Sequence, residues 1–137
     1  MTCNNRWKKR HKKIYILQKS IILTQDYYEK SIQYFQKINP NCKFLIFSDE
    51  PLLKSELELF KDFDFKLSLN STPTNLYEEM ISCGGGIISN SSLSWLAGFH
   101  LKLLNPDASI VAPLNHIGHN IGVEIPEGIN YNGFINI

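Results

Sequence analysis

Four small polar residues, at positions 89–92, stand where the sequence changes from a short apolar run to a helical pattern. Ile87 and Ile88 before them are typical of a short buried strand, and apolar residues after them repeat at helical spacing. Ser91 and Ser92 suit the N-cap position, because a serine hydroxyl can accept a hydrogen bond from a first-turn N–H group. The N–H groups and positive dipole end of such a helix favour an anion such as a diphosphate. A capped turn that binds nothing is the commoner structure for this pattern.

Asp49 is a second candidate, because it follows the segment 43–48, most of which is apolar. A strand that is apolar throughout indicates a parallel sheet covered by helices on both faces. In open sheets of this kind, ligands bind beyond the carboxyl ends of the strands, where Asp49 and residues 89–92 are both expected. Because Pro51 follows closely, helix capping is the alternative role for Asp49.

Two histidines, His116 and His119, are three residues apart in a segment rich in glycine and asparagine. Histidine can bind transition metals, but no third ligand occurs at matching spacing, and a glycine-rich loop holds ligands poorly. We therefore interpret both as surface histidines of a loop and expect no metal site there. The cysteines, Cys3, Cys42 and Cys83, are too widely spaced for a metal or disulfide motif, so buried free thiols are expected.

The elements that must position these residues alternate between helix and strand. The first predicted helix is capped by Asp26, ends at Asn39, and has an apolar face formed by Tyr28, Ile32, Phe35 and Ile38. Further helices are expected from Pro51 to about Phe60, over 75–83 and from Leu93, and strands over 43–48, 63–69, 86–89 and 109–112. This alternation predicts an α/β fold with a doubly wound, Rossmann-like parallel sheet. Segments 43–48, 86–89 and 109–112 should lie in one such sheet, with the helices from Asp26 and Leu93 packed on it.

Residues 1–13 stand apart as a basic arm. Six of the 14 Lys and Arg residues lie between positions 6 and 13, which leaves 8 basic against 13 acidic residues in the rest. The arm could attract nucleic acid or anionic lipid, but we favour a solvated, disordered tail that is dispensable for folding. The remainder, residues 14–137, is interpreted as one nucleotide-sugar-binding domain.

Composition places the chain among ordinary globular proteins, with 43% apolar and 20% charged residues in a length of 137 that suits a single domain. No apolar run approaches the ~20 residues of a membrane span. The start lacks the apolar core of a signal peptide. We therefore expect a cytoplasmic protein that meets a membrane at most as a peripheral protein.

Four segments of the chain form a recognisable series. They read Asp-Tyr-Tyr-Glu-Lys-Ser-Ile (26–32), Phe-Leu-Ile-Phe-Ser-Asp-Glu (44–50), Ile-Ile-Ser-Asn-Ser-Ser-Leu-Ser-Trp (87–95) and Ile-Val-Ala-Pro (110–113). The series resembles the α-1,2-fucosyltransferases of glycosyltransferase family 11. That family has, in the same order, a "YY-x-x-A-I" helix, an "F-x-I-F-S-D-D" strand, an "I-I-(S/A)" strand with an "N-S-(S/T)-F-S-W-W" run, and a "V-I-A-P" strand.

The resemblance implies a GT-B-type enzyme with two facing Rossmann-like halves, of which this chain is similar to the carboxy-terminal, nucleotide-binding half. The donor would be GDP-fucose, the acceptor a galactoside-type glycan, and the reaction an inverting transfer without a metal. Asn90, Ser91 and Ser92 would contact the diphosphate, and Ser94 would belong to the same substrate site. Trp95 would support the turn, with simple core packing as the alternative.

Asp49 and Asn75 are further substrate-binding positions by the resemblance, although the family's acidic residue near the second is replaced here by Asn75 or Leu76. Other departures are larger. The family's "H-x-R-R-G-D-Y" motif, whose arginine contacts the diphosphate, is missing where residues 11–17 stand, and so is the acceptor half before it. The catalytic residues therefore stay undefined, and we expect a truncated chain that binds guanine nucleotide weakly and needs a separate amino-terminal half for transfer.

Two other classes of function stay open. One is a module that binds a guanine nucleotide or nucleotide sugar without turnover. The other is a protein that binds nucleic acid or an anionic surface through residues 6–13. Within this class, we consider nucleic acid the less favoured partner. Salt distinguishes this last class, because contacts to phosphate weaken steeply with ionic strength.

Overall fold

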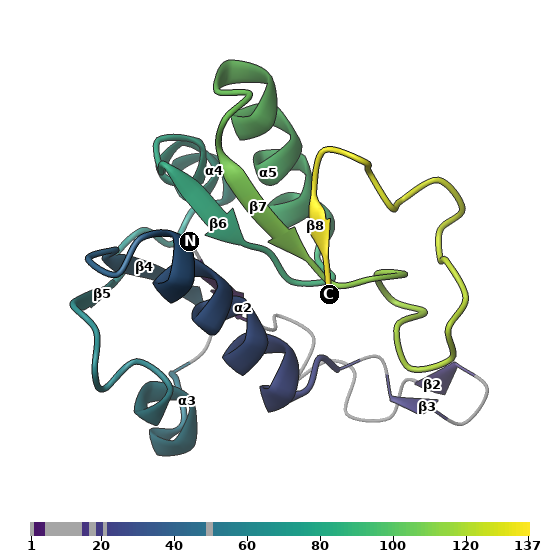
Figure 1. The fold of residues 1–137 in the computed structure, drawn as a ribbon, viewed down its shortest axis with the longest axis horizontal. Helices are drawn as coiled ribbons and strands as arrows, with labels where there is room; N and C mark the ends of the chain where they lie inside the picture. The colour runs from purple at the N-terminus through teal and green to yellow at the C-terminus, as the bar shows by residue number, and fades with distance from the viewer. Residues whose placement is uncertain (1, 5–14, 17–18, 21, 49–50) are drawn as a thin grey trace.

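The computed structural model describes residues 2–4, 15–16, 19–20, 22–48 and 51–137 (Figure 1). At its centre is a parallel sheet of six strands in the order β5-β4-β1-β6-β7-β8. The strands are β1 (Thr2–Asn4), β4 (Phe44–Ser48), β5 (Phe65–Leu67), β6 (Gly85–Ile87), β7 (Ser109–Ala112) and β8 (Ile135–Asn136). A separate antiparallel pair consists of β2 (Tyr15–Ile16) and β3 (Lys19–Ser20). The prediction that three of these segments share one parallel sheet is confirmed.

The sheet reverses its order at β1. From β1 the chain builds outward through β4 to β5, then crosses to the other side of β1 and builds outward through β6 and β7 to β8. β1 therefore pairs with β4 on one side and with β6 on the other. In open parallel sheets, the crevice for a ligand forms at such a reversal, beyond the carboxyl ends of the strands.

The position of β1 differs from the expected disordered arm. Its three residues pair with β4 in parallel register, with Thr2 opposite Ile46 and Asn4 opposite Ser48. The expectation was wrong for residues 2–4, because their backbone fills the space between β4 and β6 and the basic cluster starts only after them. The basic residues 6–13 lie outside the described residues.

Helices cover both faces of the sheet (Figure 1). They are α2 (Gln25–Ile38), α3 (Lys54–Glu58), α4 (Pro73–Ile81) and α5 (Ser92–Leu104). Side-chain alternation along the strands divides the core between the faces, because successive residues of a strand point to opposite sides. Val111 packs in the cluster with Tyr27 and Ile32 of α2, whereas its neighbour Ile110 packs with Met80 of α4 and with α5. The expected packing of helices on the sheet is thus confirmed, with α2 and α5 on opposite faces.

Two details of the helices differ from expectation. α2 is capped by Thr24, whose Oγ1 accepts a hydrogen bond from the Tyr27 N–H at 3.4 Å, so Asp26 lies inside the first turn. The buried face of α2 includes Tyr27 and Ser31, while Ile38 is 49% exposed. The apolar face was therefore predicted about one residue too far along the helix. Tyr27 and Tyr28 are adjacent aromatic residues, and helical spacing alone does not show which of them points to the core.

α5 lies close to the sheet because of Gly98. A Cβ at this position would lie 3.1 Å from Cγ2 of Ile110 and 3.3 Å from Cγ2 of Ile88. The helix can therefore approach β7 and the end of β6 more closely than a larger residue would allow. This close contact fixes the height of the first turn of α5 above the carboxyl edge of the sheet.

Candidate functional site

The candidate anion site is the turn of residues 89–92, which joins β6 to α5 at the carboxyl edge of the sheet (Figure 1). Ser91 is the N-cap residue, with extended backbone angles (φ −106°, ψ 135°), and its carbonyl accepts the N–H of Trp95 at 2.9 Å. Its hydroxyl accepts no capping hydrogen bond from the first turn. The expected serine cap is therefore present in the backbone but not in the side chain, so Ser91 itself does not satisfy the first-turn N–H groups.

Ser94 holds the shape of this turn from inside. Its Oγ donates toward the carbonyl oxygens of Ser91, at 3.0 Å, and Ser89, at 3.2 Å, and lies 3.4 Å from Oγ of Ser89. Both serines are buried. Ser94, which was predicted to belong to the substrate site, is thus bonded within the turn, and a contact with substrate stays a prediction.

Exposure increases along the turn. Asn90 is 3% exposed, Ser91 is half-buried and Ser92 is exposed. A ligand approaching the carboxyl edge would therefore meet Ser92 and Ser91 first, together with the N–H groups of the first turn of α5. Asn90 sits deeper, beneath that surface.

Trp95 joins α5 to the long segment that follows β7. Its indole Nε1–H donates to the carbonyl oxygen of Ile129 at 3.0 Å. The ring stacks on Phe99, with centroids 5.4 Å apart and planes inclined by 8°, and meets the edge of Phe134. Trp95 was expected either to support the 89–92 turn or to pack in the core. These contacts correspond to packing, because they anchor the 113–134 segment against the helix.

Asn75 lies at the same edge of the sheet as the 89–92 turn. α4 and α5 both run antiparallel to the strands, so both helices begin at the carboxyl edge. A hydrogen bond of 2.7 Å between Tyr77 Oη and His100 Nδ1 joins the two helices. Asn75 is exposed in the first turn of α4, where its N–H donates to Thr72 Oγ1 at 3.3 Å. Asp49 lies outside the described residues, so its expected place beside them stays a prediction.

Tyr27, a buried tyrosine that was not among the predicted residues, lies beneath this edge of the sheet. Its hydroxyl, which comes from α2, lies 2.6 Å from the carbonyl oxygen of Ile88 and 3.3 Å from that of Val111. It thus links the ends of β6 and β7 directly beneath the turns that follow them. Burial, and secondarily the neighbouring Tyr28, raises the pKa of Tyr27 well above its usual value, opposed by a hydrogen bond with Ser31. The paired tyrosines were the available signal, but helical spacing selected the wrong one.

The turn after β7 contains the two histidines, and it is not the surface loop that was expected. His116 is 8% exposed, and the backbone of both Asn115 and His116 has positive φ, at 63° and 52°. Burial lowers the pKa of His116 to about 4, helped by charge on His119 and opposed by the carbonyl of Ile125. The expectation was wrong for His116 because loop composition indicates flexibility and polarity but not which side chain folds inward.

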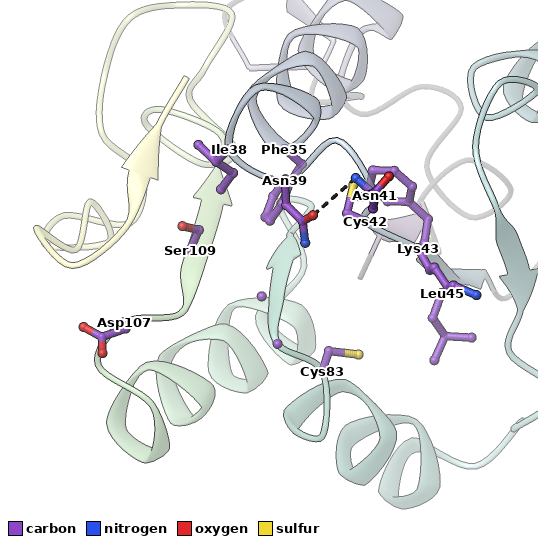
Figure 2. Close-up of a pocket in the computed structure, with 13 residues that line it drawn as sticks. Phe35, Ile38, Asn39, Asn41, Cys42, Lys43, Leu45, Cys83, Asp107 and Ser109 are labelled. Carbon is purple, nitrogen blue, oxygen red and sulfur yellow. Dashed lines mark hydrogen bonds between the residues drawn. The ribbon is translucent and has the colours of Figure 1, made fainter.

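The described cavity lies at the opposite edge of the sheet (Figure 2). Its volume is about 530 Å³, and it is lined by the end of α2, the amino ends of β4 and β7, and the segment 83–85 before β6. Asn39 Oδ1 accepts the N–H of Asn41 at its rim, at 3.2 Å. Lys43 is paired with Asp64, at 2.7 Å, and burial raises the pKa of the Cys83 thiol. These side chains supply neither an available cation nor an activated nucleophile.

A comparison with known protein families, with curated proteins and with solved structures found no match to this chain. Within the described part of the chain, no three His, Cys, Asp or Glu side chains are grouped as a metal site would require. In the same residues, no helix has both the length and the apolar character of a membrane span.

Proposed function

We propose that the chain binds the diphosphate of a guanine nucleotide sugar at the first turn of α5. The observation that carries this proposal is the place of the 89–92 turn. It follows a parallel strand at the carboxyl edge of the sheet, and β6, which it continues, is the strand beside the reversal at β1. Helix N-termini at such edges are favourable anion sites, because N–H groups and the helix dipole point at the ligand.

The strand order supports a more specific fold. Numbered along the chain, the sheet has the order 3-2-1-4-5-6, which is the order of Rossmann-like sheets that bind dinucleotides. Together with the sequence resemblance, this order leads us to propose the carboxy-terminal half of a GT-B-type α-1,2-fucosyltransferase. GDP-fucose is then the donor, and a galactoside-type glycan is the acceptor.

The donors of the site are the N–H groups of the first turn. Because the Ser91 hydroxyl does not cap them, a diphosphate can take the place that a capping oxygen has in other helices. In an inverting transfer the acceptor hydroxyl displaces GDP from the anomeric carbon, and negative charge grows on the leaving diphosphate. Preorganised donors at this turn would stabilise that charge.

Transfer requires more than these donors. The sequence lacks the "H-x-R-R-G-D-Y" arginine of the resembled family, and losing one donor to developing charge typically costs about 3 kcal/mol, or at least a hundredfold in rate. Positioning of the acceptor is a further requirement. We therefore propose that residues 1–137 bind the nucleotide without transferring fucose, and that transfer also needs an acceptor-binding half.

The test compares two substitutions at one position. Ser92→Pro removes the backbone N–H at the first helical position, where proline is well tolerated, and the extended backbone of Ser91 is the conformation that a following proline requires. Ser92→Ala removes the hydroxyl alone. By calorimetry, GDP should bind about tenfold more weakly to the proline variant, because a hydrogen bond to a charged group is lost, and the alanine variant should lie nearer to wild type.

The controls are chemical and functional. GMP should bind more weakly than GDP, because the terminal phosphate contributes most of the contact with the helix N-terminus. Failure of GDP to bind, or equal binding by wild type and Ser92→Pro, contradicts the site. Transfer from radiolabelled GDP-fucose to lactose by the chain alone contradicts the requirement for a second half. Binding without transfer in the presence of any candidate half favours a non-catalytic module.

A further inference from the structure

We infer that Asn132 is a site of covalent self-modification, at which the backbone of Gly133 converts the asparagine side chain into aspartate and isoaspartate. These two residues form the only Asn-Gly pair of the sequence, and they lie just before β8. The site is separate from the turn of residues 89–92, so the inference does not depend on the proposed nucleotide.

A tight turn presents the two reacting groups. The Phe134 N–H donates to the carbonyl oxygen of Tyr131 at 3.0 Å, which makes Asn132 and Gly133 the central residues of a β-turn. Asn132 is exposed, and among the described residues neither its side-chain amide nor the Gly133 N–H has a hydrogen-bond partner. The attacking nitrogen and the attacked amide carbon are therefore free of bonds that would hold them in place.

The reaction closes a five-membered ring, because the Gly133 nitrogen is already joined to Asn132 through the backbone. Hydroxide removes the proton of this nitrogen, which attacks Cγ of Asn132, and the side-chain nitrogen leaves as ammonia. Water then opens the cyclic imide. Opening at Cγ gives aspartate, and opening at the former backbone carbonyl gives isoaspartate. One water enters and one ammonia leaves, so the step needs no oxidant or reductant.

Glycine is the neighbour that suits this chemistry best, since it has no side chain to hinder the approach of its own nitrogen. The fold requires glycine here for a separate reason. An added Cβ at Gly133 would lie 2.3 Å from Cε1 and 2.8 Å from Cζ of Tyr131, so the tyrosine ring occupies the space of a side chain. The packing of the turn thus also supplies the least hindered neighbour for Asn132.

Other asparagines lack this combination of features. Asn70 is also exposed, but its Nδ2 donates to Glu79 at 2.8 Å, and the residue after it is a serine. Asn105 is followed by Pro106, which has no N–H group to attack the side chain. We therefore expect Asn132 to react well before these two asparagines.

The products change both the charge and the length of the chain at an anchoring point of the fold. Each product has a carboxylate in place of a neutral amide. Isoaspartate also adds one carbon to the main chain between Tyr131 and Phe134, whose rings are 5.1 Å apart. The Tyr131 ring meets Phe99, and the Phe134 ring meets Trp95. Isoaspartate should therefore loosen the aromatic cluster that holds the 113–134 segment against α5.

The test is incubation of the full chain at pH 8, followed by digestion and mass spectrometry with fragmentation that distinguishes isoaspartate from aspartate. Asn132 should be converted with isoaspartate as the larger product, while Asn70 in the same sample stays intact. Asn132→Gln is the matched control, because glutamine would have to close a larger ring and should not react over the same time. The folded chain should react within about tenfold of the chain unfolded in urea, a barrier difference of at most about 1.4 kcal/mol.

A second measurement tests the structural consequence. Ion exchange separates the modified chain by its added negative charge, and thermal unfolding compares it with wild type. The isoaspartate form should unfold at a lower temperature, whereas Asn132→Asp, which adds the charge alone, should unfold near wild type. Absence of conversion, equal conversion of Asn70, or aspartate without isoaspartate would overturn the site. An isoaspartate form as stable as wild type would overturn the loosening of the cluster.

Discussion

Two turns follow adjacent parallel strands at the same edge of the sheet, and they differ in what they leave unsatisfied. In the 89–92 turn, the buried hydroxyl of Ser94 is bonded to the turn itself, and the backbone N–H groups of a helix start are left to act as donors. In the turn of His116 and His119, both ring nitrogens of His116 and Nε2 of His119 are buried without a hydrogen-bond partner among the described residues. The first turn therefore leaves its donors near the surface, whereas the second leaves its unpartnered atoms buried, although the two turns follow neighbouring strands.

The two turns also differ in what supports them. The first continues directly from Ile88, which is fully buried between the sheet and α5. The second is held by an amide pair, a carboxylate and the contact between Trp95 and Ile129. Apolar packing thus fixes one turn, whereas hydrogen bonds fix the other, and substitutions can separate these two kinds of support.

The largest expected effect is that of Ile88→Ala. Removing a fully buried side chain next to the first turn should lower the free energy of unfolding by about 3 kcal/mol, through lost transfer energy and the cavity left behind. Leu114→Ala, which changes an exposed side chain next to the second turn, should cost less than about 0.5 kcal/mol. Urea unfolding measures both. Similar losses for the two variants would show that apolar packing supports both turns equally.

Tyr27→Phe tests a contact that joins the strand ends from which both turns start. The phenol hydroxyl is bonded to carbonyls at the ends of both strands, so its removal should cost about 1–2 kcal/mol at pH 8. The native pKa of Tyr27 is raised, so this contribution is complete below about pH 10 and is lost as the pH rises further, because unfolded chains ionise there and the native hydroxyl does not.

Urea unfolding of wild type and Tyr27→Phe at pH 8 and above pH 10 measures this dependence. The difference in unfolding free energy between them should shrink at the higher pH. A difference that stays constant would mean that the hydroxyl is accessible to solvent and titrates normally in the folded protein.

The sequence predicted the parts of this structure that depend on apolar periodicity. The parallel alignment of 43–48, 86–89 and 109–112 followed from their apolar composition and the helices between them. β1 was missed because a three-residue strand is too short to show a period and stands beside a basic cluster. Such a strand forms because β4 and β6 pair with it, and a local sequence pattern does not show pairing between segments far apart in the chain.

The candidate sites divide in the same way. The helix start at Ser91 was predictable, since strand, polar turn and helix leave a local pattern. The sequence could not predict which serine faces inward. Ser94 does so because the folded turn brings the carbonyls of Ser89 and Ser91 within hydrogen-bonding distance of its hydroxyl. The burial of His116 was equally invisible, because a positive φ at two successive residues, Asn115 and His116, turns the chain in a way that composition does not encode.

The smallest expected effect, Ser94→Ala, bears most directly on the difference between the turns. The variant removes the hydroxyl that reaches the carbonyls of Ser89 and Ser91, and the second of these keeps its bond from the Trp95 N–H. Only one buried carbonyl therefore loses its partner, and the free energy of unfolding should fall by about 1 kcal/mol. The first turn of α5 would then be less well positioned, so GDP should bind a few fold more weakly to the variant than to wild type. Asn130→Ala, which breaks the amide pair with Asn115, is the matched variant of the other turn and should leave GDP binding as in wild type. Calorimetry with GDP on both variants measures this difference: if Asn130→Ala weakens GDP binding as much as Ser94→Ala does, the two turns form one coupled site and are not supported separately.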